Sequence, residues 1–302
     1  MNILGCGSAL PTIRRNPTSQ LVYVQERQLL LDCGEGTQLQ LRKYKFKFHK
    51  INHIFISHLH GDHYLGLMGL LASFSLLGRK STINIYAPKP LNEILKIHFK
   101  KGYNDLDFKI NFIELNTKKE ELILDDGVIE VRSFPVVHRI DCCGFSIKEK
   151  IKQGNLKKSA IDKYNISIEQ IVNIKKGANF LYKGKVIPNS EIIKSPPKPR
   201  KYSYCADTKY SESIIPYIEN SDLLYHESTF LENMSDRAKT TYHSTALDAA
   251  RIASKSKVKK LLLGHYSARY KNLIEFEAEA KQIFSNVVAV KDGDIFTIDL
   301  RY

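Results

Sequence analysis

The stretch Ser57-His58-Leu59-His60-Gly61-Asp62-His63 places three imidazoles and one carboxylate within six residues. The apolar run at residues 54–56 leads into it, and on extended backbone His58 and His60 point the same way. Gly61 relieves the backbone where the chain turns, so that Asp62 and His63 face back from the start of the next helix. This H-x-H-x-D-H motif predicts a metal site at a strand end. Zinc suits the donors best, and manganese or iron suit them less well.

The composition is that of a globular protein, because 43% of the 302 residues are hydrophobic. No clean apolar stretch reaches about 18 residues, so we expect no membrane span. The first residues lack the charged and apolar regions of a signal peptide. The five cysteines show no C-x-x-C spacing, which favours a reducing compartment over a disulfide framework. We therefore expect a cytoplasmic protein with no membrane partner.

Most of the net charge of +14 is concentrated in one segment. Residues 146–201 contain 14 Lys and Arg against 4 Asp and Glu, a balance of +10. The segment has weak hydrophobic periodicity and ends in Ser195-Pro196-Pro197-Lys198-Pro199-Arg200, a composition typical of a stiff, extended spacer. We therefore predict a projecting basic insertion at residues 149–201, whose partner is a polyanion, nucleic acid first.

Strands and helices alternate along the rest of the chain, which predicts an α/β fold. The main predicted helices cover residues 38–44, 64–77, 212–219, 244–254 and 273–284, and two strands are expected after the last of them. In layered α/β proteins the loops at strand ends hold functional sites. Six apolar runs here are followed directly by a polar residue that can bind metal: Asp32, His58, His138, Asp207, Glu227 and His265. Together with the H-x-H-x-D-H motif, they indicate one shared cavity with a binuclear metal site.

These residues also carry a family resemblance. The metal-binding set, in its order and approximate spacing, resembles the metallo-β-lactamase superfamily, and within it the chain resembles the ribonuclease Z family of tRNA 3′ endonucleases. The similarity spans nearly the whole chain. The motifs that carry it are Leu4-Gly5-Cys6-Gly7-Ser8-Ala9, Asp32-Cys33-Gly34-Glu35, Ala206-Asp207-Thr208, His226-Glu227-Ser228-Thr229, His243-Ser244-Thr245 and His265-Tyr266-Ser267.

The resemblance implies an αββα sandwich, formed by residues 1–148 and 202–302, with the site at one edge. It implies two zinc ions per subunit, with manganese as an alternative. The expected ligands are His58, His60 and His138 for one ion and Asp62, His63 and His265 for the other, with Asp207 as the bridge. Asp62 is expected to help orient the attacking water, and Asp32 to hold one ligand imidazole through a hydrogen bond.

The resemblance also assigns the remaining catalytic roles. His243, oriented by Glu227, is expected to protonate the leaving 3′-oxygen. Removal of the 3′ trailer from precursor tRNA would leave a 3′-hydroxyl on the tRNA and a 5′-phosphate on the trailer. Arg269 is a candidate phosphate contact. The basic insertion corresponds to the family's flexible arm, in which Lys157, Lys158, Lys175 and Lys176 are candidate tRNA contacts.

The resemblance further implies a homodimer, in which the arm of one subunit holds the tRNA that the other cuts. The chain departs from the family at Asn165-Ile166-Ser167-Ile168-Glu169, where many members have a Gly-Pro-rich tip, and at Ile13, where many have lysine. Two alternatives stay open at this point. One is another hydrolase of the same fold, such as a small phosphodiesterase or a glyoxalase-II-like thioesterase, which would not need the arm. The other is an RNA-binding protein without turnover, which does not require an intact ligand set.

Overall fold

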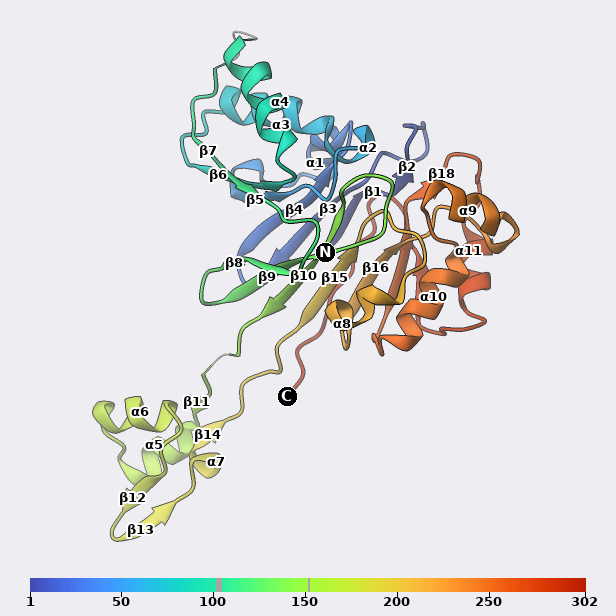
Figure 1. Cartoon of the computed structure of the whole chain (residues 1–302). Coiled ribbons are helices and arrows are strands. Elements are labelled where there is room, and N and C mark those ends of the chain that lie inside the picture. Colours follow the sequence, from blue (N-terminus) through green and yellow to red (C-terminus); the bar gives the residue numbers. More distant parts are fainter. Residues whose placement is uncertain (102–104, 152) are drawn as a thin grey trace. The chain divides into compact units, whose positions relative to one another are not determined.

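The computed structural model describes residues 1–101, 105–151 and 153–302 (Figure 1). The chain divides into two compact units. The larger contains Met1–Lys148 and Lys201–Ile298, and the smaller contains Glu149–Arg200 and Asp299–Tyr302. The last four residues thus belong to the smaller unit, whereas they were predicted in the larger. Lys201, predicted as the last residue of the insertion, belongs to the larger unit because it begins a strand of its second sheet. Residue 152 of the predicted arm lies outside the described residues.

The first sheet of the larger unit has six strands in the order β1-β3-β4-β5-β6-β7. The strands are β1 (Asn2–Gly5), β3 (Ser19–Val24), β4 (Arg27–Cys33), β5 (Ile51–Phe55), β6 (Ile83–Ala87) and β7 (Ile110–Glu114). From β4 to β7 neighbouring strands are parallel, and such strands are buried on both faces. The helices that follow these strands are α1 (Thr37–Lys43), α2 (Gly61–Tyr64), α3 (Gly66–Leu76) and α4 (Pro90–Lys96).

The second sheet has seven strands in the order β19-β17-β16-β15-β10-β9-β8. They are β8 (Glu121–Asp125), β9 (Ile129–Pro135), β10 (Cys143–Glu149), β15 (Lys201–Cys205), β16 (Leu223–Glu227), β17 (Leu261–Gly264) and β19 (Val287–Ala289). Its helices are α8 (Ile215–Ile218), α9 (Ser235–Thr241), α10 (Ala246–Lys255) and α11 (Ile274–Ala280). A short parallel pair, β2 (Gly7–Ser8) and β18 (Tyr266–Ser267), joins the segment after β1 to the segment after β17.

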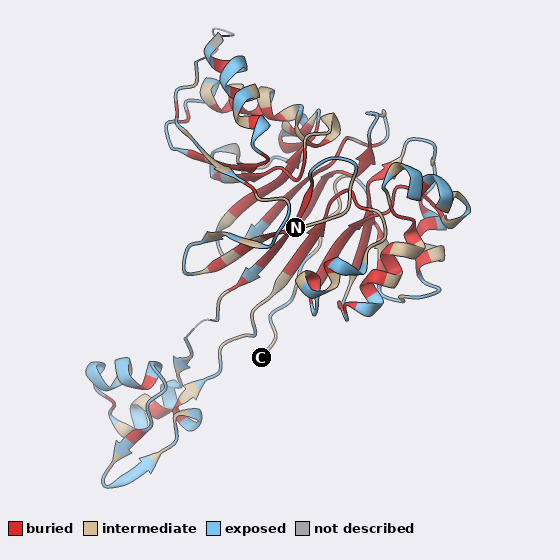
Figure 2. Ribbon diagram, viewed as in Figure 1, coloured by how far each residue is buried: buried red, intermediate tan, exposed pale blue. Residues whose placement is uncertain are grey.

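The two sheets pack face to face, and helices cover their outer faces (Figure 1). Leu29 and Leu31 of β4 belong to the core that both sheets share, whereas Leu30 between them packs with the helices of the first sheet. The rings of Phe55 in β5 and Phe145 in β10 lie 5.5 Å apart, centroid to centroid. Figure 2 shows the central strands of the two sheets buried and the outer helix faces largely exposed. The predicted αββα order of layers is therefore present.

The helix that follows the H-x-H-x-D-H motif packs closely on the loop after β4. A Cβ atom on Gly66, the first residue of α3, would lie only 2.1 Å from the carbonyl oxygen of Gly34. Only glycine permits this approach. The contact holds the start of α3 against the loop that follows Asp32. It therefore fixes the position of the H-x-H-x-D-H motif, which directly precedes α3, relative to the end of β4.

Two predicted elements differ from the structure. The predicted helix at residues 212–219 is split into a 3-10 turn, Glu212–Ile214, and the single-turn α8, because Pro216 has no N–H to donate. The predicted pair of terminal strands is wrong, since β19 is the only strand that the structure describes after α11. The segment beyond it makes single contacts instead, such as the bridge between Ile295 and Asn2.

The smaller unit folds around its own core. It contains α5 (Lys158–Tyr164), α6 (Ile168–Lys175), α7 (Asn189–Ile192) and two strand pairs, β11 (Asn155–Leu156) with β14 (Ile193–Lys194) and β12 (Phe180–Tyr182) with β13 (Lys185–Ile187). Its hydrophobic core contains Ala160, Ile166, Ile174, Phe180 and Ile192. At the point where the family's Gly-Pro-rich tip is absent, Ser167 and Gln170 form a capping box that starts α6. The weak periodicity of this segment therefore hides ordered structure.

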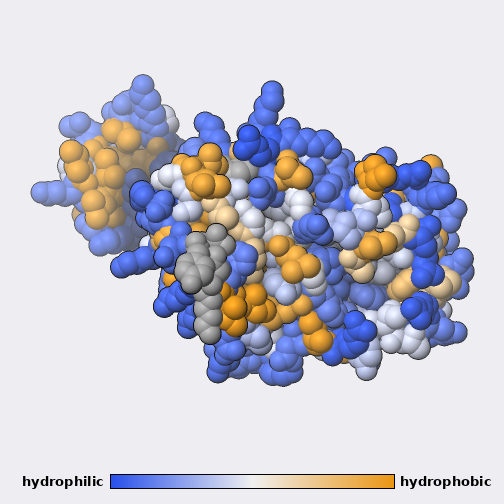
Figure 3. Space-filling view, turned by 90° about the horizontal axis from the view of Figure 1, so that it is seen from above, coloured by the Kyte–Doolittle hydropathy of each residue, from blue (hydrophilic) through white to orange (hydrophobic). Residues whose placement is uncertain are grey.

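The face seen in Figure 3 is mainly hydrophilic. In the view of Figure 3, several apolar patches are separated by hydrophilic residues. Among the described residues, no helix combines the length and the apolar character needed to cross a bilayer.

Candidate metal centre

The structure brings all seven predicted ligand residues together at one edge of the paired sheets. Each follows or ends a strand: the H-x-H-x-D-H motif follows β5, His138 follows β9, Asp207 follows β15 and His265 follows β17. Because β15, β16 and β17 are parallel neighbours, their carboxyl ends meet at the same edge. Asp62 and His63 lie in the single turn of α2, which starts at Gly61.

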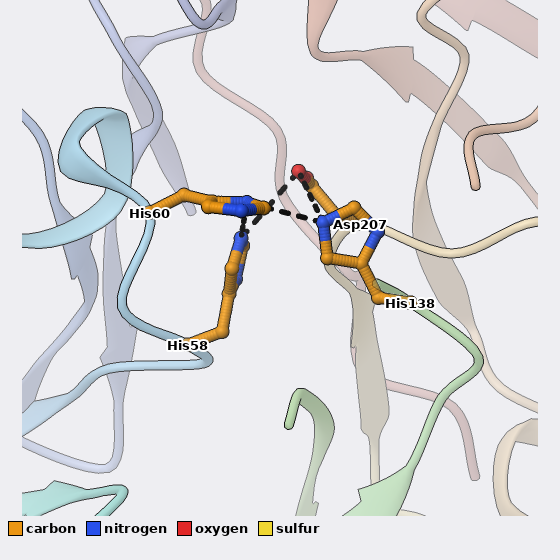
Figure 4. A group of neighbouring side chains, drawn as sticks. All are labelled: His58, His60, His138 and Asp207. Atoms are coloured by element: carbon orange, nitrogen blue, oxygen red, sulfur yellow. Dashed lines mark hydrogen bonds and ion pairs between the residues drawn. The ribbon is translucent and has the colours of Figure 1, made fainter. Parts of the chain in front are cut away.

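One group of side chains consists of His58, His60, His138 and Asp207 (Figure 4). The imidazoles converge nitrogen to nitrogen. Nε2 of His58 lies 3.0 Å from Nδ1 of His60, and Nε2 of His138 lies 3.1 Å from that same atom. Oδ2 of Asp207 lies 3.5 Å from Nε2 of His58. One donor atom from each residue lies within 4.8 Å of all the others, so the four side chains could hold one metal ion.

A second group consists of Asp62, His63 and His265. Nε2 of His265 lies 3.3 Å from Nε2 of His63 and 3.3 Å from Oδ2 of Asp62. Asp207 reaches this group as well, because its Oδ1 lies 3.1 Å from Nε2 of His265 and 3.3 Å from Nε2 of His63. Asp207 thus faces one group with Oδ2 and the other with Oδ1.

The chemistry of both groups fits a divalent cation. Burial first, and then the charge of a neighbouring imidazole, lowers the pKa of His58 and of His60 to about 4, so both rings keep a free lone pair at neutral pH. Burial also favours a neutral His63, but Asp207 and Asp62 outweigh it and raise its pKa. Buried Oδ1 of Asp207 has no hydrogen-bond partner among the described residues. A cation would satisfy this oxygen and replace the proton on His63.

The ring nitrogens that face away from the two groups are held by partners outside them, as is usual for metal-binding histidines. The contacts are His58 Nδ1 with Ser57 Oγ at 3.0 Å, His63 Nδ1 with Asp32 Oδ2 at 2.8 Å, His138 Nδ1 with the Tyr242 carbonyl at 3.0 Å, and His265 Nδ1 with Thr229 Oγ1 at 3.0 Å. The sequence analysis found only Asp32 among these partners. Hydroxyls and a backbone carbonyl carry no signal of their own in a sequence.

The predicted hydrogen bond between Asp32 and an imidazole of the site is confirmed. Asp32 is fully buried and also accepts hydrogen bonds from the N–H of Ser57 at 2.7 Å and from the hydroxyls of Ser57 and Tyr204 at 2.9 and 2.5 Å. Asp32 and His265 both have left-handed backbone, with φ of 52° and 61°. Non-glycine residues adopt this conformation only where surrounding contacts stabilise it, often at functional sites.

Glu227 and His243 form a hydrogen-bonded pair beside the two groups. Nδ1 of His243 lies 2.8 Å from Oε1 of Glu227, which is fully buried at the end of β16. Burial opposes a charge on His243, but the carboxylate of Glu227 outweighs it and raises the pKa of the imidazole to about 9. Glu227 also accepts hydrogen bonds from the backbone N–H groups of Thr208 and Thr229. These bonds fix its position.

A cleft of about 340 Å³ opens onto these side chains. Its lining includes His60, Asp62, Asp207, His243 and His265, together with Ala9, Glu35, Leu65 and Arg139. The sequence analysis missed Arg139, an exposed cation whose guanidinium lies 3.4 Å from Nε2 of His60. It proposed Arg269 instead, but that side chain does not line the cleft and lies over the ring of Phe230 at 5.2 Å.

Comparison with known proteins gives the family. A ribonuclease Z of Parabacteroides distasonis is 43% identical over 294 residues, which is 97% of each chain. The chain belongs to the ribonuclease Z family. It is therefore an endoribonuclease, and a divalent metal is implied. Residues 1–152 also match a family model described as the anti-Pycsar protein Apyc1. The matched residues include the H-x-H-x-D-H motif of this chain.

Solved structures support the fold. The short form of human tRNase Z superimposes with a TM-score of 0.73 at 26% identity, covering 99% of this chain and 98% of that one. YhfI of Bacillus subtilis, described as a metallo-β-lactamase fold protein, gives a TM-score of 0.68 at 21% identity over 97% of this chain and 96% of its own. The predicted metallo-β-lactamase fold is confirmed.

The four lysines predicted to contact tRNA lie in the smaller unit and differ in their surroundings. Nζ of Lys157 donates to the carbonyl oxygens of Ser190 and Glu191 at 3.2 and 2.8 Å, so it stabilises the smaller unit itself. Lys158, Lys175 and Lys176 are exposed, the first at the start of α5 and the other two at the end of α6. These three are free to contact a polyanion.

We expect Asp32→Asn to weaken metal binding about 10- to 100-fold, because the amide replaces the charged acceptor that holds His63. Competition with a chromophoric chelator measures this affinity. Asp222→Asn is the matched control, since Asp222 is also a buried carboxylate but precedes β16 at the opposite end of the strand. Equal metal affinity in the two variants would contradict the role of Asp32.

Proposed function

We propose that this enzyme removes the 3′ trailer from precursor tRNA, leaving a 3′-hydroxyl on the tRNA and a 5′-phosphate on the trailer. Relatives that match nearly the whole chain are named ribonuclease Z, and the solved human structure is named tRNase Z. The observation that carries the proposal is the placement of Asp207 between two groups of metal-binding side chains. Such a site suits phosphodiester hydrolysis.

We further propose two zinc ions per subunit, with manganese as an alternative. His58, His60 and His138 would hold one ion, and Asp62, His63 and His265 the other. Asp207 would serve both, because its two oxygens face different groups. When bound, the ions would lower the pKa of water towards neutrality and neutralise charge on the phosphodiester.

The chain's own residues then position the reacting groups. The carboxylate of Asp62 is fixed by the N–H of Ala9, at 2.8 Å from Oδ2, and is oriented to accept a hydrogen bond from the attacking water. Arg139 lines the cleft as an exposed cation and is placed to contact a phosphate oxygen. His243, whose Nδ1 is engaged by Glu227, presents Nε2 as the atom that protonates the departing 3′-oxygen.

His243 also lies near Asp207 and His265, so it could in principle be a metal ligand. We assign it to proton transfer because its Nδ1 is held by a buried carboxylate and its side chain, at 15% exposure, borders the cleft. Among the predicted ligands, His58, His138 and His265 are held by hydroxyls or a backbone carbonyl, whereas His63 is held by the buried carboxylate of Asp32. The exposure of His243 to the cleft therefore carries the assignment.

The smaller unit is proposed to bind the tRNA body through exposed lysines on α5 and α6. Contacts of this kind are electrostatic and depend strongly on salt. We also propose a cytoplasmic homodimer, in which the arm of one subunit holds the tRNA that the other subunit cuts.

The direct test is incubation with a 3′-extended tRNA transcript, with and without a chelator. We expect one cut at the 3′ side of the tRNA body, a 3′-hydroxyl on the tRNA and a 5′-phosphate on the trailer. The chelator should abolish the reaction, and added Zn²⁺ or Mn²⁺ should restore it. Products with 2′,3′-cyclic phosphate ends, or cleavage that is insensitive to the chelator, would refute the proposal.

His243→Ala should lower the cleavage rate by about 10²–10⁴, since a general acid contributes on this order. Metal content should be unchanged, because the proposed ligands are intact. Single-turnover cleavage and metal analysis on the same preparation provide the two measurements. His98→Ala, an exposed histidine outside the site, is the control. A loss of bound metal in His243→Ala would make this residue a ligand and not an acid.

Removal of the arm should separate binding from chemistry. The N–H of Glu149 donates to the carbonyl of Arg200 at 3.0 Å, and the side chains of these residues are paired, so a short Gly-Ser turn can replace residues 151–199. We expect this variant to lose most pre-tRNA cleavage but to hydrolyse bis(p-nitrophenyl) phosphate normally. Equal loss of both activities would count against the binding role of the arm.

A further inference from the structure

A second basic region lies in the larger unit, outside the arm. Between Gly36 and Asn92 the chain has eight Lys and Arg but one acidic residue, Asp62. Five of these cations fall within residues 42–50, whose sequence is Arg-Lys-Tyr-Lys-Phe-Lys-Phe-His-Lys. None of the five takes part in the proposed mechanism. We call residues 42–50 the basic segment.

The cations of the basic segment are exposed, and none forms an ion pair with a carboxylate in the part of the chain that the structure describes. Arg42 and Lys43 lie in the last turn of α1, where the helix dipole favours positive charge. That effect fades beyond the helix and does not account for Lys45 or Lys47. The interleaved rings of Tyr44 and Phe46 pack against the core of the first sheet. They anchor the segment so that its cations stay on the outside.

The basic segment borders a cleft of about 510 Å³. The residues that line it are Arg42, Lys45, Phe46 and His49 from the segment, and Phe74, Leu77, Gly78 and Arg79 from the end of α3 and the turn after it. The cleft thus combines an apolar surface with a cationic rim. A base or ribose fits the first, and a phosphate fits the second.

Arg79 adds a positive charge that forms no ion pair with a carboxylate of residues 1–101, 105–151 or 153–302. Arg79 is only 7% exposed, and its hydrogen bonds to the described residues go to neutral oxygens. These belong to Ile51, Asn52, Ser81 and Thr82, at 2.7–3.1 Å. The guanidinium also lies 5.3 Å from the ring centroid of Phe74, which lines the cleft. A buried, uncompensated charge raises the positive potential of the cleft above it.

Two helices connect this cleft to the catalytic cleft. Leu65 lines the catalytic cleft just before α3, and Leu77 lines the basic cleft just after it. Likewise Glu35 and Arg42 lie near opposite ends of α1, which packs beside α3 (Figure 1). The 11 residues of α3 span about 16 Å at about 1.5 Å each. That is about five nucleotides of a stacked strand at about 3.4 Å per phosphate.

We propose that the cleft between the basic segment and the end of α3 binds single-stranded RNA of the 3′ trailer, about five nucleotides beyond the cut. The inference rests on the proposed function, because it takes the trailer as one of the products. A paired stem hides its base faces from an apolar surface, whereas a single strand presents both base and phosphate. The site would therefore favour substrates with longer trailers and show little dependence on their sequence.

Lys45 provides a test that does not weaken the fold. It has left-handed backbone, with φ of 58°, at the position that closes α1. Glycine adopts this conformation without cost, so Lys45→Gly removes the charge and leaves the thermal midpoint unchanged or higher. Lys257, with φ of 53° after α10, is equivalent in conformation and exposure. Lys257→Gly is therefore the matched control.

The measurement compares precursor tRNAs with trailers of two and twelve nucleotides under single-turnover conditions. We expect Lys45→Gly to lower kcat/KM for the long trailer about threefold or more, and the triple variant with Arg42→Gln and Lys47→Gln to lower it at least tenfold. The short trailer, bis(p-nitrophenyl) phosphate and Lys257→Gly should show no change. Removal of one phosphate contact should also make the plot of the logarithm of the binding constant against the logarithm of the salt concentration less steep, by about 0.7 in slope.

A direct binding measurement keeps this proposal separate from the proposed function. Fluorescence anisotropy at 4 °C measures the binding of a labelled 12-nucleotide RNA, which is checked to be intact afterwards. This measurement tests RNA binding by the cleft even if precursor tRNA is not the substrate. Weaker binding by the triple variant supports the site. The proposal would be overturned if Lys45→Gly and Lys257→Gly had equal effects, or if the variants affected both trailers equally. It would also be overturned if the variants changed the molecular mass measured by light scattering, because this face would then be a subunit contact.

Discussion

The buried carboxylate of Asp207 is the contact on which the rest of the site depends. It is 2% exposed, and its two oxygens face different groups of imidazoles. An ionised carboxylate is costly to bury unless cations or hydrogen bonds compensate it. Although burial opposes the charge, His265 and His63 hold the pKa of Asp207 well below its usual range. A buried, ionised Asp207 is therefore stable only because strands from both sheets end at the same place, where their histidines surround its carboxylate.

Parallel strands make this convergence predictable from the sequence. A strand buried on both faces appears as a continuous apolar run, and the first polar residue after it falls at the sheet edge. His265 follows such a run at the end of β17, Asp207 follows β15, and the H-x-H-x-D-H motif follows β5. His138 instead follows β9, an antiparallel strand whose burial alternates, and it is recognised by its residue type. The residues that the structure brings together at this edge were therefore recognisable from order and residue type, without any knowledge of the turns between strands.

The sequence conveys less about the groups that hold those residues in place. Tyr242 supplies a backbone carbonyl, and Thr229 and Tyr204 supply hydroxyls, which occur in every protein and have no characteristic spacing. Arg139 differs from other surface arginines only in its position beside the cleft. The order within the smaller unit was missed for another reason: its helices and strands have two to eight residues, too few for a periodic pattern to develop.

The basic segment was not identified in the sequence analysis, because the charge was averaged over all residues outside the arm. With the arm set aside, the remaining residues have a nearly even balance, yet Gly36–Asn92 contains a marked excess of cations that acidic residues elsewhere offset. A polyanion responds to local charge, since interactions beyond about 10 Å are screened at physiological salt. The proposed catalysis and the proposed binding are thus assigned to different parts of this molecule. Buried hydrogen bonds hold the proposed metal-binding side chains within the core, whereas exposed cations of the smaller unit and of the basic segment are the proposed RNA contacts, whose binding energy would depend on salt. Because substrate contacts far from the cut contribute to affinity without touching the reacting atoms, these surfaces can differ among relatives while the chemistry stays the same.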